Sequence, residues 1–239
     1  MHPRSHGIVR AAAVFGVAAL AGLSLFPIMS RAAEDAVTIP APAKDIAATA
    51  GPQTVVLAGG CFWGVQGVFQ HTAGVLKAVS GYAGGDKSTA MYEIVSTGAT
   101  GHAEAVQVTY DPSRISYGKI LQIYFSVVHD PTQLNRQGPD VGTQYRSAVF
   151  AQTEEQKQIA DSYIAELNAA KVYSKPIVTR VDMAKGFYPA EAYHQDYLVR
   201  HPEQPYIVFH DLPKVRNLKK MFADYYVEKP TLVGDVAAN

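Results

Sequence analysis

The sequence predicts an α+β domain, a two-layer sandwich of ferredoxin-like β-α-β-β-α-β plan with a mixed sheet. Stretches typical of strands alternate with stretches at helical spacing in that order, and a further helix and strand follow. The chain has 239 residues, of which 48% are hydrophobic. It is therefore long enough to bury the core that such a domain needs.

The first half of this plan begins at Thr54. Residues 54–58 (TVVLA) form a short β-rich run that ends at a glycine pair. The following CFWGVQGVFQH has helical spacing, which places Cys61 in the first turn of a helix. The next two stretches, GVLKAVSGYAGG and HAEAVQVTYD, are typical of strands.

The second half contains two further helix-strand pairs. SYGKILQIYFSVVHD is an expected amphipathic helix and SAVFAQ a strand. In TEEQKQIADSYIAELNAAKVY, Thr153 is the expected N-cap of a helix and Gln156 completes a capping box. PIVTRVDM then indicates a strand, and PAEAYHQDYLVRH a helix that begins at Pro189. The loop at residues 130–146 is long, polar and rich in glycine, which favours a functional role.

The N-terminal segment has the pattern of an export signal. Arg4 and Arg10 precede a mostly apolar run, and Ser30 and Ala32 stand at −3 and −1 of a possible cleavage point. We therefore expect residues 1–32 to be a signal peptide that directs the protein to the periplasm or cell envelope. The alternative is an uncleaved membrane anchor, because about 19 apolar residues are enough to span a bilayer.

Composition divides the rest of the chain into three parts. Residues 33–53 are rich in alanine and proline and are expected to form a linker of polyproline II character. Residues 54–212 are expected to be the folded domain, and residues 213–239 a C-terminal helix and tail. The formal net charge is zero, and no nucleic-acid-binding pattern is present, so we expect no nucleic-acid partner.

The only cysteine, Cys61, lies in GGCFWG together with the only tryptophan, Trp63. A single thiol cannot form an internal disulfide, so it is either buried and inert or kept because it reacts. Three features favour a reactive thiol: a helix N-terminus that stabilises a thiolate, glycines that let a ligand approach, and the apolar wall of Phe62 and Trp63. The alternative is that both aromatic side chains simply fill the core.

Other polar residues suggest a proton-donating site. Glu104 begins an otherwise apolar strand, Tyr92 lies in MYEIVSTG, and the 130–146 loop carries Asp140 and Tyr145. Each alone is commoner as a capping or surface residue. A carboxyl and two phenols that converge on a thiol pocket would donate protons to a polar oxygen.

Five motifs, in this order, resemble those of the A-type peptide-methionine sulfoxide reductases: GGCFWG, GYAGG, TGHAE, HDPTQLNRQGPDVGTQYRS and AEAYHQDYL. The likeness extends from about Thr54 to His210. It implies that the protein reduces the S epimer of methionine sulfoxide, in proteins or free, to methionine through a sulfenic acid on Cys61. It implies repair of oxidised envelope proteins, with methionine sulfoxide in those proteins as the partner, and neither a cofactor nor a metal.

The resemblance also implies roles for single residues. Cys61 is the nucleophile, Glu104 the acid, and the hydroxyls of Tyr92 and Tyr145 hold the sulfoxide oxygen. Burial among aromatic side chains would keep Glu104 protonated by raising its pKa. The residues expected to bind the substrate or border the site are Phe62, Trp63, Asp140, His194 and Tyr197.

Two departures from the family pattern affect these expectations. Gln66 stands where many relatives have a glutamate, so a negative charge near the thiol is missing. The C-terminal segment lacks the second cysteine that many relatives use to resolve the sulfenic acid. An external thiol, such as a thioredoxin-like protein, a glutaredoxin or glutathione, is therefore expected to recycle a monomeric enzyme.

Other classes of protein fit the sequence less well. A cysteine hydrolase would pair Cys61 with a histidine such as His194, but nothing indicates an acyl substrate. A metal site would need ligands from the histidines, which lack a spacing such as HExxH: His102, His129, His194, His201 and His210. GxGxxG and GxxxxGK[ST] phosphate loops are absent. A non-catalytic binding module with an inert buried cysteine is the remaining alternative.

Overall fold

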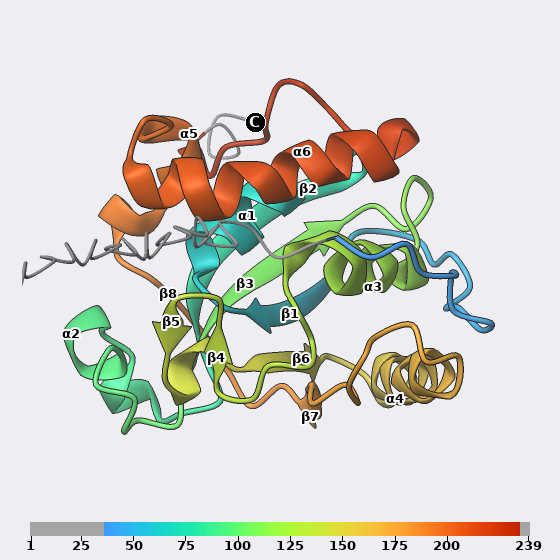
Figure 1. Ribbon diagram of the computed structural model, residues 1–239, viewed down its shortest axis with the longest axis horizontal. Helices are drawn as coiled ribbons and strands as arrows, with labels where there is room; N and C mark the ends of the chain where they lie inside the picture. The colour runs from blue at the N-terminus through green and yellow to red at the C-terminus, as the bar shows by residue number, and fades with distance from the viewer. Residues whose placement is uncertain (1–35, 235–239) are drawn as a thin grey trace, which may run out of the picture. The chain divides into compact units, whose positions relative to one another are not determined.

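A six-stranded sheet in the order β7-β6-β1-β3-β2-β8 forms the centre of the computed structural model, which describes residues 36–234 (Figure 1). Its strands are β1 (Gln53–Gly59), β2 (Val75–Ala83), β3 (Ala103–Tyr110), β6 (Ser147–Ala151), β7 (Arg180–Met183) and β8 (Phe187–Pro189). Within the four central strands, β6-β1-β3-β2, every pair of adjacent strands is antiparallel, in the order that the ferredoxin-like plan requires. β7 pairs parallel to β6, so the sheet is mixed and the predicted fold class is confirmed.

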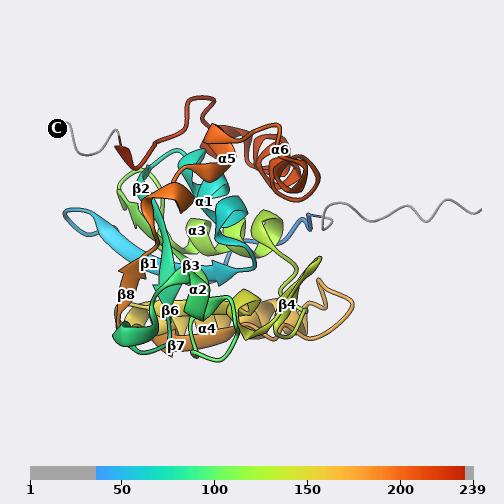
Figure 2. The same cartoon turned by 90° about the vertical axis from the view of Figure 1, so that its left-hand side faces the viewer.

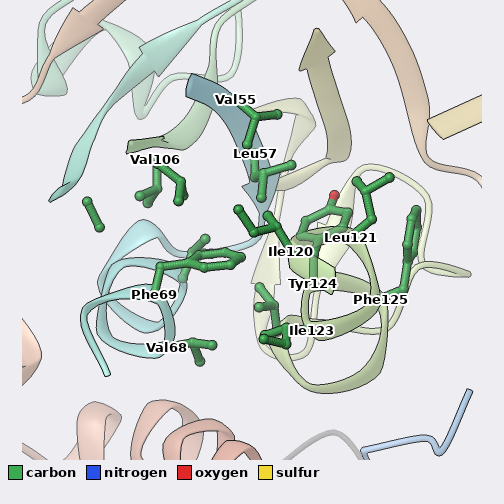
Figure 3. Close-up of a cluster of buried hydrophobic side chains, with 14 of the residues drawn as sticks. Val55, Leu57, Val68, Phe69, Val106, Ile120, Leu121, Ile123, Tyr124 and Phe125 are labelled. Atoms are coloured by element: carbon green, nitrogen blue, oxygen red, sulfur yellow. The ribbon is translucent and has the colours of Figure 1, made fainter. Parts of the chain in front are cut away.

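Three helices, α1 (Phe62–Gln70), α3 (Tyr117–Ile123) and α4 (Glu154–Ala169), enclose the main core with one face of the sheet. Strand alternation explains the two faces, because Val55 and Leu57 of β1 belong to this core and Val56 to a smaller cluster rich in alanine. Figure 3 shows Val55 and Leu57 in the same cluster as Phe69 of α1.

The ends of these helices follow local sequence signals. The Ser116 side chain caps α3 by accepting a hydrogen bond from the Lys119 N–H at 3.1 Å. The Thr153 side chain caps α4 in the same way through the Gln156 N–H, which confirms the predicted N-cap. α3 continues into a wider turn, η2 (Tyr124–Val128), in which the Tyr124 hydroxyl donates to the carbonyl of Ala58 at 2.7 Å. This bond ties α3 to the end of β1.

The first described part of the segment expected to be a linker, residues 36–46, contacts the domain, whereas residues 47–52 are exposed. Ile39 is buried, and its carbonyl accepts a hydrogen bond from Gln122 Nε2 at 2.8 Å. The carbonyl of Pro40 accepts one from the Tyr163 hydroxyl at 2.5 Å. An extended, proline-rich strand has no internal hydrogen bonds, so side chains of α3 and α4 can pair with its free backbone groups.

The predicted helix from Pro189 is wrong as a continuous element. Pro189 ends β8, and the chain then forms η4 (Ala192–His194) and the short α5 (Tyr197–Arg200). Asp196 lies between them with φ of 57°, and its N–H donates to Gln66 Oε1 at 2.9 Å. This tertiary hydrogen bond stabilises a backbone break that helical periodicity cannot indicate.

The C-terminal helix belongs to the same fold. α6 (Leu212–Met221) starts one residue before the expected domain boundary and packs on the outer side of α1 (Figure 1). The described residues all lie in one compact unit, and no helix among residues 36–234 is long and apolar enough to cross a membrane. The expected signal peptide, residues 1–32, lies outside the described part of the chain.

Candidate active site

Cys61 lies at the junction where β1 turns into α1. It is the N-cap residue of α1, and its side chain is only 8% exposed. Gly60 has φ of 88°, a backbone conformation that favours glycine, and a Cβ there would lie 2.6 Å from Gln137 Cγ. The glycine therefore allows both the sharp turn and the close approach of the 130–146 loop.

The electrostatic environment of the thiol differs from the sequence-based expectation. The nearby backbone N–H of Trp63 lowers the pKa of Cys61, as expected of a helix start. Burial, and after it the nearby carboxyls of Glu104, Asp211 and Asp140, raise that pKa, and the net result is a pKa well above the ordinary value. Without substrate, Cys61 is therefore a thiol at neutral pH, and thiolate stabilisation by the helix start alone is insufficient.

Glu104 is the candidate proton donor beside the thiol. It stands on β3 next to β1, is 3% exposed, and accepts a hydrogen bond from the Phe62 N–H through Oε2 at 3.0 Å. Burial is the main cause that raises the pKa of Glu104 to about 8, although the Phe62 N–H opposes it. The carboxyl is therefore mostly protonated at neutral pH, as the sequence predicted, and can donate a proton.

Tyr92 and Tyr145 come from two segments that the fold joins. Tyr92 begins α2 (Tyr92–Val95) and Tyr145 ends η3 (Thr143–Tyr145). The Gln144 side chain donates to the carbonyl of Ser96 at 3.1 Å and so fastens η3 to the end of α2.

Both phenols share the electrostatic environment of the thiol. Burial is the first cause that raises the pKa of Tyr92 and of Tyr145, and the proximity of Glu104 and other acidic groups adds to it. Both hydroxyls therefore stay protonated at neutral pH and are available as hydrogen-bond donors near the thiol and the carboxyl.

The expected aromatic residues form one cluster at the start of α1, in which Trp63 and Tyr197 are stacked. Trp63 lies flat on Tyr197, with ring centres 3.8 Å apart and an interplanar angle of 8°. Trp63 Nε1 donates to His194 Nδ1 at 3.2 Å, and the rings of Phe62 and His194 are 5.0 Å apart. Because burial lowers the pKa of His194, the imidazole is neutral, and acceptance at Nδ1 places its proton on Nε2. Phe62 is fully buried and Trp63 partly exposed.

Asp140 and Cys61 line the same small cavity. It lies in β5 (Asp140–Val141), which pairs with β4 (Arg136–Gln137), and its Oδ2 accepts a hydrogen bond from the Tyr206 hydroxyl. A small cavity of about 20 Å³ lies between Cys61, the 137–140 turn, and the side chains of Tyr206, His210 and Lys214. This volume suits one water molecule or one small polar group.

Three residues near the thiol were not predicted from the sequence: Tyr206, Asp211 and Lys214. Tyr206 meets Trp63 edge to face with ring centres 6.0 Å apart. Lys214 Nζ lies 3.2 Å from Asp211 Oδ1, and both side chains are buried. The i,i+3 spacing of this pair is a signal for an ion pair on a helix, but nothing in the sequence places that helix beside Cys61.

Glu191 is another missed residue and orders Tyr92. Its two oxygens accept hydrogen bonds from the Tyr82 hydroxyl at 2.8 Å and from the Tyr92 N–H at 3.0 Å. The carboxylate thus holds the start of α2 against β2, the strand of Tyr82.

Gln66 has a structural role instead of changing the charge near the thiol. Its Nε2 donates to the carbonyl of Ala78 at 3.0 Å and to Gln195 Oε1 at 2.9 Å, and its Oε1 accepts from the Asp196 N–H. A glutamate in the ionised form would lose both donated bonds. The side chain therefore connects α1, β2 and the segment before α5.

The histidines considered as metal ligands make polar contacts at separate places in the fold. His102 Nε2 contacts the carbonyl of Asp86 at 2.9 Å, and His129 Nε2 contacts Ser147 Oγ at 2.6 Å. Among residues 36–234, no three potential metal ligands come together.

The fold and site together define a thiol-based oxidoreductase, because the fold brings a buried thiol, a protonated carboxylic acid and two phenols close to one another. The chain matches the family described as "Peptide methionine sulfoxide reductase" over residues 53–226. It is 63% identical over 189 residues to "Peptide methionine sulfoxide reductase MsrA 2" of Mesorhizobium japonicum, covering 79% of this chain and 97% of that protein. It is 50% identical over 190 residues to the protein of the same name from Synechocystis sp., covering 78% and 89%.

Solved structures agree with this result. Reduced Mxr1 from Saccharomyces cerevisiae has a TM-score of 0.60 at 32% identity, covering 68% of this chain and 92% of that one. Methionine sulfoxide reductase A of Corynebacterium diphtheriae has a TM-score of 0.56 at 31% identity, covering 74% and 92%. The chain belongs to the A-type peptide methionine sulfoxide reductases, oxidoreductases that reduce methionine sulfoxide and thereby repair oxidised proteins.

Proposed function

We propose that Cys61 is the nucleophile that takes the oxygen from methionine sulfoxide. The sulfur of Cys61 attacks the sulfoxide sulfur, the S–O bond of the substrate breaks, and the oxygen is transferred to Cys61. The products are methionine and a sulfenic acid, Cys–SOH, and the proton count balances because the thiol loses one proton and the oxygen gains one. The methionine sulfur is reduced by two electrons and the cysteine sulfur is oxidised by two.

In this scheme Glu104 moves the proton. The single observation that carries the proposal is the bond from the Phe62 N–H to Glu104 Oε2 at 3.0 Å, because it holds a carboxyl with a pKa of about 8 at the residue next to the thiol. The carboxylic acid protonates the sulfoxide oxygen as negative charge develops, and it regains a proton from the thiol. This exchange removes the need for a thiolate in the resting enzyme.

The two sides of the pocket favour one stereoisomer. The phenols of Tyr92 and Tyr145 are suited to hold the oxygen, and the aromatic rings of Phe62 and Trp63 are suited to hold the methyl group. Asp140, His194 and Tyr197 order these two sides. With the oxygen and the methyl group assigned to fixed sides of Cys61, only one epimer presents its sulfur to the thiol, and we propose that this is the S epimer.

Recycling of the sulfenic acid requires a second thiol from another molecule, because the sequence has one cysteine. A thioredoxin-like protein, a glutaredoxin or glutathione would supply it. The thiol condenses with Cys–SOH and releases water, and a further thiol then reduces the mixed disulfide. We propose that a monomer carries out the whole cycle.

We also propose export to the cell envelope, where the substrates would be oxidised envelope proteins. The support is the sequence pattern of Arg4, Arg10, the apolar run and the small residues Ser30 and Ala32. Protein recovered from the native cell envelope should begin near Ala33. An intact mass that includes residues 1–32, together with retention in membranes, would indicate an anchor.

The activity is tested with the separated S and R sulfoxides of one methionine peptide, with dithiothreitol as the reductant and methionine as the readout. We expect reduction of the S epimer and almost none of the R epimer. Equal rates on both epimers would refute the proposed arrangement of the pocket. A lack of methionine from either would refute the activity itself.

A further inference from the structure

The segment that follows α6, residues 227–233, is anchored on the end of α1. The Val227 N–H donates to the carbonyl of His71 at 2.9 Å, and the Thr231 N–H donates to the carbonyl of Gln70 at 3.0 Å. Both carbonyls stand at the C-terminal end of α1, where a helix leaves carbonyl groups without intrahelical partners. The 227–233 segment is therefore held by main-chain hydrogen bonds to α1.

The same segment reaches Asp196, the residue before α5. The Val233 N–H donates to Asp196 Oδ1 at 3.0 Å, and Gln70 Nε2 donates to the same oxygen at 2.7 Å. Arg200 Nη2 lies 3.3 Å from Asp196 Oδ2. Figure 2 shows α5 close to α1, with the last described residues (dark red) beside both. Asp196 is thus the point where the segment, α1 and α5 are joined.

The Asp196 carboxylate needs these donors because it is buried. Its side chain is only 1% exposed, and a buried carboxylate that lacks hydrogen-bond donors is costly in free energy. The Gln70 and Arg200 donors belong to α1 and α5, whereas the Val233 N–H belongs to the 227–233 segment. The segment after α6 therefore contributes to holding Asp196 in place.

Asp196 in turn fixes the direction of α5 and of Tyr197, its first residue. The Asp196 carbonyl accepts hydrogen bonds from the N–H groups of Val199 and Arg200 at 3.1 and 3.0 Å, which form the first turn of α5. The φ of 57° at Asp196 sets the direction in which that turn leaves. Tyr197 then lies flat on Trp63. A change at Asp196 is therefore transmitted to the Trp63 ring.

We infer that Asp196 is a positioning residue through which the 227–233 segment holds the Tyr197–Trp63 stack in place for substrate binding. This inference rests on the proposed function, since the Trp63 ring is one side of the proposed pocket. In this chain the segment after α6 carries no cysteine, and its main chain orders the pocket instead. The inferred role concerns binding and leaves the chemical step at Cys61 unchanged.

The test uses two readouts on the full chain. Single-turnover reactions without reductant, on the S epimer of acetyl-Ala-Met(O)-Ala-amide, give the half-saturating substrate concentration and the maximal rate, free of the recycling step. Trp63 is the only tryptophan, so quenching of its fluorescence by acrylamide reports directly on the stack. This second readout needs no activity.

Two pairs of variants separate the hydrogen bonds from other effects. Asp196→Gly removes the carboxylate at a φ that glycine adopts readily, whereas Asp196→Asn keeps an acceptor at Oδ1. Val233→Pro removes the N–H donor, whereas Val233→Ala keeps it. We expect the glycine and proline variants to raise the half-saturating concentration about tenfold, because the pocket would be assembled in about a tenth of the molecules.

The same two variants should make Trp63 easier to quench and leave the maximal rate unchanged. The asparagine and alanine variants should match the unchanged protein in both readouts. Urea unfolding establishes that each variant is folded. If the glycine variant is not, the Val233 pair decides, because Val233 lies outside the helices and strands of the described chain.

The inference has clear contrary results. An unchanged half-saturating concentration and unchanged quenching in Val233→Pro would overturn it. A lower maximal rate at an unchanged half-saturating concentration would assign Asp196 to the chemical step and would overturn it too. If the unchanged protein formed no methionine, the proposed function would fail, and quenching of Trp63 would still decide whether the segment holds the stack.

Discussion

Glu104 shows how a single residue acquires its chemistry from its surroundings. Its carboxyl has an ordinary pKa in water, and burial between β1 and β2 is the main cause that raises that pKa to about 8, with Asp140 and Asp211 raising it further. The same burial raises the pKa of Cys61. Neither Glu104 nor Cys61 is therefore charged in the resting site, because two negative charges at close range in an apolar environment are costly in free energy.

A first prediction concerns the rate. Glu104→Gln keeps the size of the side chain and removes its acidic proton, so the reductase step should slow by about 10²–10⁴-fold, the usual contribution of a positioned general acid. Single-turnover formation of methionine measures this step directly. Rates close to those of the unchanged protein would exclude Glu104 as the acid.

A second prediction concerns stability and uses the same variant. Between pH 4.5 and about 8, the folded protein keeps a proton on Glu104 that the unfolded chain has lost, so the free energy of unfolding falls as the pH rises through this window. Glu104→Gln lacks this dependence. The two proteins should have similar stabilities near pH 4.5, and the variant should be more stable by up to about 5 kcal/mol above pH 8. Urea unfolding at several pH values measures the difference, and parallel pH profiles would contradict the raised pKa.

At the scale of elements, the site depends on how closely α6 approaches α1. Gly64 of α1 faces the buried pair of Asp211 and Lys214, and a Cβ at Gly64 would lie 2.1 Å from Asp211 Oδ1. At position 64, the side of α1 that faces α6 therefore has no room for a side chain. The contact also places Lys214 at the cavity beside Cys61.

The corresponding prediction is that Gly64→Ala destabilises the protein by about 3 kcal/mol, because the methyl group would separate the two helices or break the ion pair. Gly234→Ala is the control, since a Cβ at Gly234 would meet no atom within 4 Å. Thermal unfolding followed by circular dichroism measures both variants. Equal melting temperatures would mean that α6 can shift without cost.

At the scale of the whole molecule, a single cysteine limits the reaction to one turnover. With substrate and no reductant, we predict one methionine per protein and a gain of one oxygen on Cys61 in the mass spectrum, or a dimedone adduct when dimedone is present. Cys61→Ser should form no methionine and serves as the control. More than one equivalent of methionine without reductant would overturn the proposed cycle.

Most of the fold could be predicted from the sequence, because hydrophobic periodicity and helix caps are local signals. The alternation of β1 assigns Val55 and Leu57 to the main core, and Thr153 marks the start of α4. The prediction failed where a distant group decides the backbone. The helix expected from Pro189 is broken near Asp196, whose N–H pairs with Gln66 in α1.

The residues of the candidate site were also only partly predictable from the sequence. Motifs were enough to name Cys61, Glu104 and the aromatic residues, since these stand in short, distinctive stretches of sequence. They could not indicate Tyr206 or Lys214, which reach the cavity from a segment about 150 residues further along the chain. By itself the sequence determined which chemical groups are present and which local elements carry them. Only the tertiary structure decided which of them meet and how deeply they are buried, and burial sets the pKa values of the thiol and its acid because charge is costly away from water.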